Sequence, residues 1–400
     1  VRLRSVGAGV NAFQLEKASD QNRFIQCAAL DFFRTGFTMD MSTNNYWISG
    51  VIAPVGVTTS GTAMSTGTLM DAKSGRLYVS NSVFAARGPA DVIYQAGPGE
   101  VIRGDYNCYH RVYESAGLGV ITDPDIPFGV NRIVLEHLGA WRDQNQSDTH
   151  SMDADPLFAD LSAGDLHPRS AQGRYSPATG EWVADAETSP LIDAADPALD
   201  WTLEPGANGR RANIGVYGNT PFASQTPSNG TFVLRGLGQG GLIRGSQSLE
   251  WFARGSATNL GHMVDILVST NSGAGWQTIG ASLATTGSFA WDTAGWPSLP
   301  TFRWRVQSQS QPAWRTESER DFMVRNTNLV YYVNDGSTAN DLYTTAPGAA
   351  TNTGRSAASP LASLGEVLER YDLEPGDIVW VDTGVYSNAV QTAMGYADSG

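Results

Sequence analysis

Basic side chains next to short β-prone runs are the residues of this sequence best suited to acid–base chemistry. Lys73, Arg76 and Arg103 lie in or beside such runs, and Lys17 and His110 are further bases in the same stretch. A base held beside a second cation can remove a proton next to a carboxylate, because the cation stabilises the developing negative charge. No paired catalytic constellation accompanies these residues, so a solvated strand face explains them more simply, and whether the chain is an enzyme stays uncertain.

Three aspartates close together in the sequence are candidates for a cation site. Asp153, Asp155 and Asp160 supply carboxylate oxygens, the hard ligands that Ca²⁺ prefers, and Asp193 and Asp196 follow in the same acidic stretch. Their spacing matches neither an EF-hand loop nor a glycine-rich calcium repeat, and acidic turns are often simply soluble. The sequence therefore requires no cofactor, and Ca²⁺ is the one that these residues would suit.

Two other residue types admit carbohydrate chemistry. Hydrolysis of a glycosidic bond needs two carboxylates across a groove, and aspartates occur on successive repeats at Asp71, Asp91 and Asp105. Exposed tryptophans can stack on sugar rings. The candidates for such binding are Trp291, Trp296 and Trp314. Solvated turns explain the aspartates equally well, and core or edge packing is the commoner role of tryptophan.

A repeat must position these residues. Short apolar runs occur at 22–25, 45–48, 76–79 and 100–102. They end at Ile25, Ile48, Val79 and Ile102, which are 23, 31 and 23 residues apart. A second apolar pair precedes each run by about ten residues. These pairs are Phe13/Leu15, Phe37/Met39, Leu69/Met70 and Val92/Ile93.

Such a period, with variable polar turns, is typical of a solenoid, because no single unit buries its own hydrophobic face. Neither a leucine comb nor long amphipathic helices are present. We therefore predict an all-β chain that opens with the last turns of a right-handed parallel β-helix, residues 1–120. Ile25, Ile48, Val79 and Ile102 should lie directly over one another inside it.

Composition narrows the possible partners. The 400 residues carry a formal net charge of −14, with a pI near 4.7, so a nucleic-acid backbone would be repelled. The sequence contains no stretch of 18 apolar residues, so it predicts no membrane span. Cys27 and Cys108 lie three predicted turns apart, roughly 14 Å and beyond disulfide reach, which favours two buried thiols. The sequence starts without a signal peptide and stops within a repeat, which predicts a piece of a longer polypeptide.

The segment 121–225 reads as an extended tail packed along the coil. It contains a short helical phrase, LEHLGAW at 135–141, and the motifs DPLF at 155–158, GDLH at 164–167, SPLIDAADP at 189–197 and NIGVYG at 213–218. These motifs resemble the C-terminal tail of bacterial right-handed β-helix repeat proteins with a pectate-lyase-like fold, over residues 1–224. Arg210 and Arg211 replace the commoner Gly-Arg pair of that family. The resemblance implies a secreted or cell-surface protein.

Two further regions follow. Seven alternating runs between 226 and 326 predict a β-sandwich, similar to immunoglobulin or fibronectin-type accessory domains, with a hairpin turn at 271–275. Residues 330–400 resemble the N-terminal cap and first rungs of a second β-helix. In this region a strand at 330–333 precedes a helix with a capping box at 363–366 and a strand at 378–381.

Together these patterns predict a fragment of a large secreted or cell-surface β-helix protein that binds glycans in an adhesin-like way. The alternative is a polysaccharide lyase or hydrolase whose active-site rungs lie mostly outside this sequence. The resemblance to lyases implies Lys or Arg as the base that removes a C5 proton from a uronic acid. A purely structural surface role is the third possibility. A polysaccharide or cell-surface glycan is the expected partner.

Overall fold

The computed structural model describes residues 3–8, 11–32, 35–53, 68–72, 75–86, 93–96, 102–111, 118–122, 132–135, 137–258, 262–371, 373 and 376–386. The chain is predominantly β and divides into two compact units, Val1–Val324 and Arg325–Gly400. Each unit is described by itself. The finer division expected from the sequence, at 120, 225 and 326, stays a prediction.

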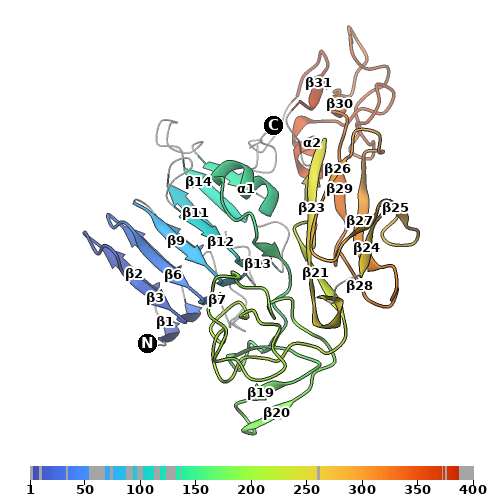
Figure 1. Ribbon diagram of the computed structural model, residues 1–400. Helices are drawn as coiled ribbons and strands as arrows, with labels where there is room; N and C mark the ends of the chain where they lie inside the picture. The colour runs from blue at the N-terminus through green and yellow to red at the C-terminus, as the bar shows by residue number, and fades with distance from the viewer. Residues whose placement is uncertain are drawn as a thin grey trace. The chain divides into compact units, whose positions relative to one another are not determined.

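Strands between residues 4 and 122 are distributed in rotation over three sheets, and two further strands, up to residue 153, add to the second and first sheets (Figure 1). The first sheet pairs β1 (Arg4–Ala8), β4 (Ala28–Phe32), β7 (Val51–Ala53), β10 (Val83–Ala86), β13 (Cys108–Arg111) and β16 (Met152–Asp153). The second pairs β2 (Asn11–Glu16), β5 (Thr35–Asp40), β8 (Thr68–Ala72), β11 (Ile93–Ala96), β14 (Gly119–Thr122) and β15 (Arg132–Leu135). The third pairs β3 (Arg23–Ile25), β6 (Asn45–Ile48), β9 (Leu77–Ser80) and β12 (Ile102–Asp105). All of these pairs are parallel except β14–β15.

A two-residue corner connects the third sheet to the first in every circuit of the chain. Its first residue has a left-handed backbone: Gln26 at φ 55°, Ser49 at 50°, Asn81 at 52° and Tyr106 at 55°. The N–H of Ser49 donates to the carbonyl of Ser80 at 2.9 Å, and that of Gln26 donates to Ile48 at 2.9 Å. Because the corner is identical in each circuit, the third and first sheets keep a constant register.

Polar side chains form a second ladder at the same corner. The hydroxyl of Ser82 accepts from the Gly50 N–H at 3.0 Å, and the amide oxygen of Asn107 accepts from the Ser82 N–H at 3.0 Å. The hydroxyl of Ser151 then accepts from the Asn107 N–H at 2.8 Å. Ser82, Asn107 and Ser151 are fully buried, so these bonds satisfy backbone groups that water does not reach.

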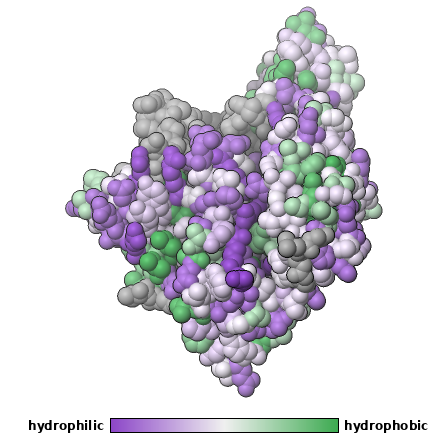
Figure 2. All heavy atoms as spheres, viewed as in Figure 1, coloured by the Kyte–Doolittle hydropathy of each residue, from purple (hydrophilic) through white to green (hydrophobic). Residues whose placement is uncertain are grey.

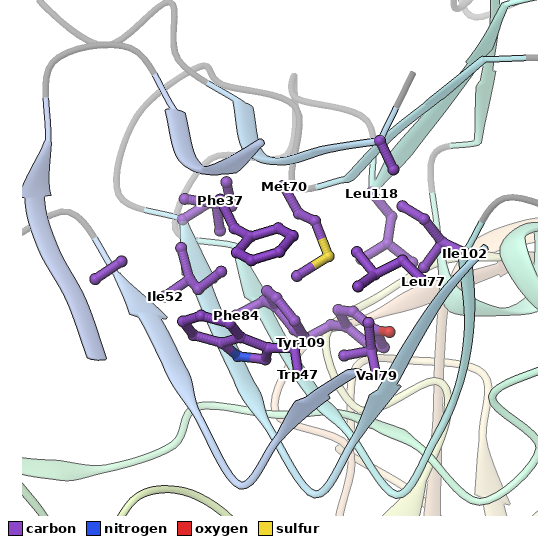
Figure 3. Packing of buried hydrophobic residues seen from close by; sticks show 14 of the residues in the cluster. Phe37, Trp47, Ile52, Met70, Leu77, Val79, Phe84, Ile102, Tyr109 and Leu118 are labelled. Atoms are coloured by element: carbon purple, nitrogen blue, oxygen red, sulfur yellow. The ribbon is translucent and has the colours of Figure 1, made fainter. Parts of the chain in front are cut away.

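The predicted column of four aliphatic residues is wrong in its register. Ile25 does pair with Ile48, but Ile48 pairs with Ser80, and Val79 pairs with Trp47. Ile102 pairs with Leu77. Ile25 is 44% exposed, whereas Trp47, Val79, Leu77 and Ile102 are buried in the interior shown in Figure 3. The last two circuits are shifted by one residue or more against the pattern, and a one-residue shift exchanges the two faces of a strand.

One column of the second apolar ladder is confirmed, whereas Met39 pairs with Ala72 and Val92 lies outside the described residues. Phe13 pairs with Phe37, Phe37 with Met70, and Met70 with Ile93. Phe37 and Met70 are fully buried, and Phe37 packs edge-on against Trp47 with ring centroids 5.3 Å apart.

The helix expected near 135–141 begins later, because Leu135 ends strand β15. Helix α1 (Leu138–Asn145) has His137 as its N-cap, whose Nδ1 accepts from the Ala140 N–H at 3.2 Å. The buried Asp148 follows the helix and accepts from Trp141 Nε1 at 2.9 Å and Tyr109 Oη at 3.0 Å. These bonds tie the helix to the last circuit.

The segment after α1 covers the outer face of the first sheet. It contains β17 (Phe158–Asp160), β18 (Asp165–Pro168), β19 (Arg174–Ser176) and β20 (Glu181–Val183). Leu191, Ile214 and Val216 pack there against Val51 and Val83. Strands β4, β7 and β10 are therefore buried on both faces.

Two sheets with a common core follow between 231 and 324. One pairs β21 (Thr231–Arg235), β23 (Ser246–Arg254) and β26 (Gly287–Asp292). The other pairs β22 (Leu242–Ile243), β29 (Phe322–Val324), β27 (Leu299–Ser308), β24 (Met263–Ser269) and β25 (Gln277–Ala284), with β28 (Arg315–Glu317) on β27. A 3₁₀ turn, Gly255–Thr258, follows β23. All seven predicted runs are strands, and the predicted hairpin joins β24 to β25.

The second unit contains β30 (Val330–Val333), α2 (Leu364–Arg370) and β31 (Ile378–Val381), and β30 and β31 pair in parallel. As predicted, Ser363 caps α2, since its hydroxyl accepts from the Glu366 N–H at 3.3 Å. Arg325 and Asp377 form a buried ion pair in this unit.

Both cysteines are buried free thiols, as predicted. Cys108 continues the first-sheet column of Val51 and Val83, and Cys27 directly precedes Ala28 of that column. In the described part of the chain, neither helix is long and apolar enough to cross a membrane.

Candidate functional site

The outer face of the third sheet carries a row of side chains of two kinds. Arg23 pairs with Tyr46, Tyr46 with Tyr78, and Tyr78 with Arg103, so the four residues form one line across β3, β6, β9 and β12. Their neighbours Phe24, Trp47 and Val79 point inward, because successive side chains of a strand alternate between faces. We call this line the arginine–tyrosine row.

Aromatic stacking organises the row. The rings of Tyr46 and Tyr78 are stacked, with centroids 5.0 Å apart and planes at 16°. The Arg23 guanidinium carbon lies 5.0 Å from the centre of the Tyr46 ring. Arg23 is exposed, and Tyr46, Tyr78 and Arg103 are half-buried. The row thus presents two aligned aromatic rings with a cation at each end.

A second polar cluster adjoins the row at the corner after β12. Asp105, two residues after Arg103 on the same face, accepts from the His150 N–H at 2.6 Å, and its other oxygen lies 2.7 Å from His150 Nδ1. The His150 and Tyr106 rings stack at 4.8 Å, with planes at 7°. This corner cluster, Asp105, Tyr106 and His150, is partly exposed.

Two arginines from later parts of the chain flank Tyr106. Arg211 and Arg235 each place their guanidinium carbon 5.6 Å from the centre of the Tyr106 ring, and both also lie over Phe252. Burial lowers the pKa of Arg211 to about 10, and the nearby charge of Arg235 adds to this shift. Burial also raises the pKa of Tyr106, with Asp105 as the second cause. Arg211 therefore stays charged at neutral pH, and Tyr106 stays neutral.

Such a face suits a polymer with rings and negative groups. Flat aromatic rings pack against the C–H faces of sugar rings, and guanidinium groups bind carboxylates or sulfates with two parallel hydrogen bonds. Figure 2 shows one face of the molecule, on which hydrophilic residues predominate and hydrophobic patches are scattered. The chain as a whole is acidic, so cations concentrated here are unusual for it.

Only some of the predicted bases belong to this site. Arg103 belongs to the row, and the exposed Arg76 lies just before β9, two residues from Tyr78. Lys73 lies outside the described residues. Lys17 is exposed in a turn, and His110 lies on β13 in the first sheet. The structure therefore brings neither Lys17 nor His110 into the third sheet.

The aspartates proposed for calcium are each engaged locally. Asp153 accepts from the Gly238 N–H at 3.3 Å, and burial raises its pKa. Asp155 accepts from the Leu157 N–H at 2.8 Å, and Asp160 from the Ala163 N–H at 3.0 Å. Among the residues that the structure describes, no three His, Cys, Asp or Glu side chains are grouped to hold a metal.

The aspartates considered for hydrolysis do not share a groove. Asp71 lies on β8 in the second sheet, whereas Asp105 lies on β12 in the third. Asp91 is outside the described residues. Asp71 and Asp105, the two that the structure describes, therefore do not form a pair of carboxylates on one face.

The three tryptophans pack in the core of residues 231–324. Trp291 is 3% exposed and has Trp296 edge-on at 5.5 Å, so its ring offers no free face to a ligand. Trp296 and Trp314 are partly buried against the same core. A binding role for these two stays a prediction.

Sequence reasoning missed the tyrosines of the row and the corner cluster. Tyr46 and Tyr78 sit in the middle of recognised runs, but the runs were aligned on their last aliphatic residue. Aligning Val79 with Trp47 instead would have placed the two tyrosines side by side. His150 approaches Asp105 across 45 residues, a contact that no local pattern reveals.

Comparison of the chain with known protein families, with curated proteins and with solved structures gave no match. The geometry of the row and the corner cluster therefore carries the functional inference.

Proposed function

We propose that this chain is part of a secreted or cell-surface protein that binds glycans in an adhesin-like way, and that the arginine–tyrosine row contacts the glycan. The observation that supports this most is the stacked Tyr46–Tyr78 pair with an arginine at each end of the row. Stacked rings favour sugars, and terminal arginines favour sugars with acidic groups.

We further infer the finer architecture. Residues 4–153 fit the end of a right-handed parallel β-helix of the pectate-lyase-like type, since strands rotate over three parallel sheets. Residues 231–324 fit an immunoglobulin- or fibronectin-like β-sandwich, and the parallel β30–β31 pair with α2 fits the start of a second β-helix. Stacked circuits of this kind offer long flat faces, which suit extended polymers.

The test is binding of pectate, alginate and chondroitin oligosaccharides to the full chain by isothermal titration calorimetry. The double substitution Tyr46→Ala/Tyr78→Ala should weaken binding about tenfold or more. Arg23→Ala should weaken the binding of acidic oligosaccharides selectively. Arg315→Ala, an exposed arginine on β28, is the matched control and should leave affinity unchanged. If the row substitutions leave the affinity for every ligand unchanged, the proposal is contradicted.

A polysaccharide lyase or hydrolase is the alternative, and one observation favours it. His150 is oriented by Asp105 at 2.7 Å and lies beside Tyr106, an arrangement that suits a general base. Its remaining active-site residues would lie outside this chain. Absorbance of unsaturated uronate products, lost in His150→Ala, would favour this enzyme over the binding protein.

A further inference from the structure

The outer face of the third sheet carries a second line of side chains beside the arginine–tyrosine row. Ile25 pairs with Ile48, Ile48 with Ser80, and Ser80 with Asp105. Each residue of this line comes two positions after a member of the row on the same strand. The two lines therefore lie on one face, about 6–7 Å apart. We call the second line the flanking line.

The flanking line is apolar at one end. Ile25 is 44% exposed and Ile48 is half-buried, whereas their neighbours Phe24 and Trp47 belong to the interior cluster. This alternation follows from the strand, since Phe24 and Trp47 point inward and the isoleucines point outward. The pair leaves apolar surface in contact with water, and a ligand that covers it gains free energy.

The other end of the flanking line is polar. The half-buried Ser80 lies next to Ile48, and its hydroxyl can both donate and accept a hydrogen bond. Asp105 is already paired with His150 at 2.7 Å. The line thus changes from apolar to hydroxyl to carboxylate over strands roughly 4.8 Å apart. A ligand on this face meets different chemistry at its two ends.

This order distinguishes between the substituents of a sugar chain. A hydroxyl or a carboxylate gains nothing from Ile25 and Ile48, whereas a methyl group gains by leaving water. The methyl group of a 6-deoxy sugar would leave Ser80 unused. An acetamido group fits both, because it has a methyl group at one end and an amide that can pair with the Ser80 hydroxyl. Arg23, two positions before Ile25, suits a neighbouring carboxylate.

We propose that this face selects glycans in which a uronic acid is next to an N-acetylated sugar. The acetamido methyl group contacts Ile25 and Ile48, and its amide pairs with Ser80. This selectivity rests on the proposed glycan binding by the arginine–tyrosine row, and it narrows the ligand to one class. Chondroitin carries the acetamido group, and pectate and alginate lack it. Ile25, Ile48 and Ser80 all have accessible surface, so the ligand reaches them without a change of the fold.

The test compares two unsulfated chondroitin hexasaccharides that differ only in their acyl group, N-acetyl or N-formyl, by calorimetry on the full chain. The N-acetyl ligand should bind about threefold more tightly or better, because it buries one further methyl group. The double substitution Ile25→Thr/Ile48→Thr should abolish this preference, and threonine keeps the β-branched shape that suits a strand. Unchanged affinity of this variant for the N-formyl ligand would also show that it is folded.

Two further variants complete the experiment. Ile378→Thr is the matched control, because Ile378 is also 44% exposed on a short strand, β31, and it should leave the preference unchanged. Ser80→Ala should weaken the N-acetyl and N-formyl ligands by the same factor, since both ligands keep the amide.

The outcomes separate this selectivity from the proposed function. If both ligands bind equally and Tyr46→Ala/Tyr78→Ala weakens them, the row binds glycans but the acetamido selectivity is overturned. A methyl preference that persists in Ile25→Thr/Ile48→Thr places the methyl group elsewhere and overturns the selectivity too. If the tyrosine substitutions leave the affinity for every oligosaccharide unchanged, the proposed function fails, and the selectivity fails with it.

Discussion

At the scale of single residues, the acidic segment after β20 depends on buried groups that serve backbone donors. Glu204 is one of them: its Oε1 accepts from the N–H groups of Asn213 at 2.8 Å and Asn219 at 2.9 Å. Its Oε2 is buried without a partner. Burial raises the pKa of Glu204 to about 7, and nearby Asp193 adds to the rise.

This shift predicts a pH dependence of stability. Because the pKa in the folded state lies above the ordinary value of 4.5, the proton-bound form is favoured by folding. The stabilising contribution is complete below about pH 4.5 and is lost as pH rises through about 7, a loss of about 3 kcal/mol. Urea unfolding of unit 1 between pH 5 and 8 should show this slope, and Glu204→Gln should flatten it.

The exposed Glu181→Gln is the control for this experiment and should keep the slope of the unaltered chain. Identical slopes for Glu204→Gln and the unaltered chain would show that Glu204 does not titrate in this range.

At the scale of elements, the corner ladder of Ser82, Asn107 and Ser151 makes a separate prediction. Asn107→Ala removes the acceptor of the Ser82 N–H and the donor to the Val79 carbonyl at 3.1 Å. The buried Ser82 N–H then loses its side-chain acceptor and the Val79 carbonyl loses this donor, so the free energy of unfolding should fall by about 1–3 kcal/mol. Urea denaturation followed by circular dichroism measures this loss.

Asn229→Ala is the matched control, because Asn229 is exposed. It should change stability by less than about 0.5 kcal/mol. Equal effects of the two substitutions would show that the ladder contributes little.

The same elements explain how far the sequence could lead. Alternating strands such as β24 and β27 were predicted because one face is polar. Strands β4, β7 and β10 were not, because these strands are buried on both faces and their short apolar runs lack a period of two. Strands β22 and β28 are too short for any pattern. The corner cluster depends on Asp105 and His150, which are 45 positions apart and come together only by packing.

At the scale of the whole molecule, the two compact units predict two unfolding transitions. Leu361 is fully buried in the core of the second unit, so Leu361→Ala should destabilise that unit by about 2–5 kcal/mol. Calorimetry should show one transition shifted and the other unchanged. A single transition that shifts as a whole would mean that the chain unfolds as one cooperative body.

The arginine–tyrosine row takes one side chain from each circuit, and parallel strands lie roughly 4.8 Å apart. The length of this face is therefore set by the number of circuits that contribute a side chain to it. Duplicating the circuit that holds Tyr78 would lengthen the row by one strand spacing. The corners and the kinds of interior contact would stay the same. The length of the ligand that binds, unlike its chemistry, would then change with the number of circuits.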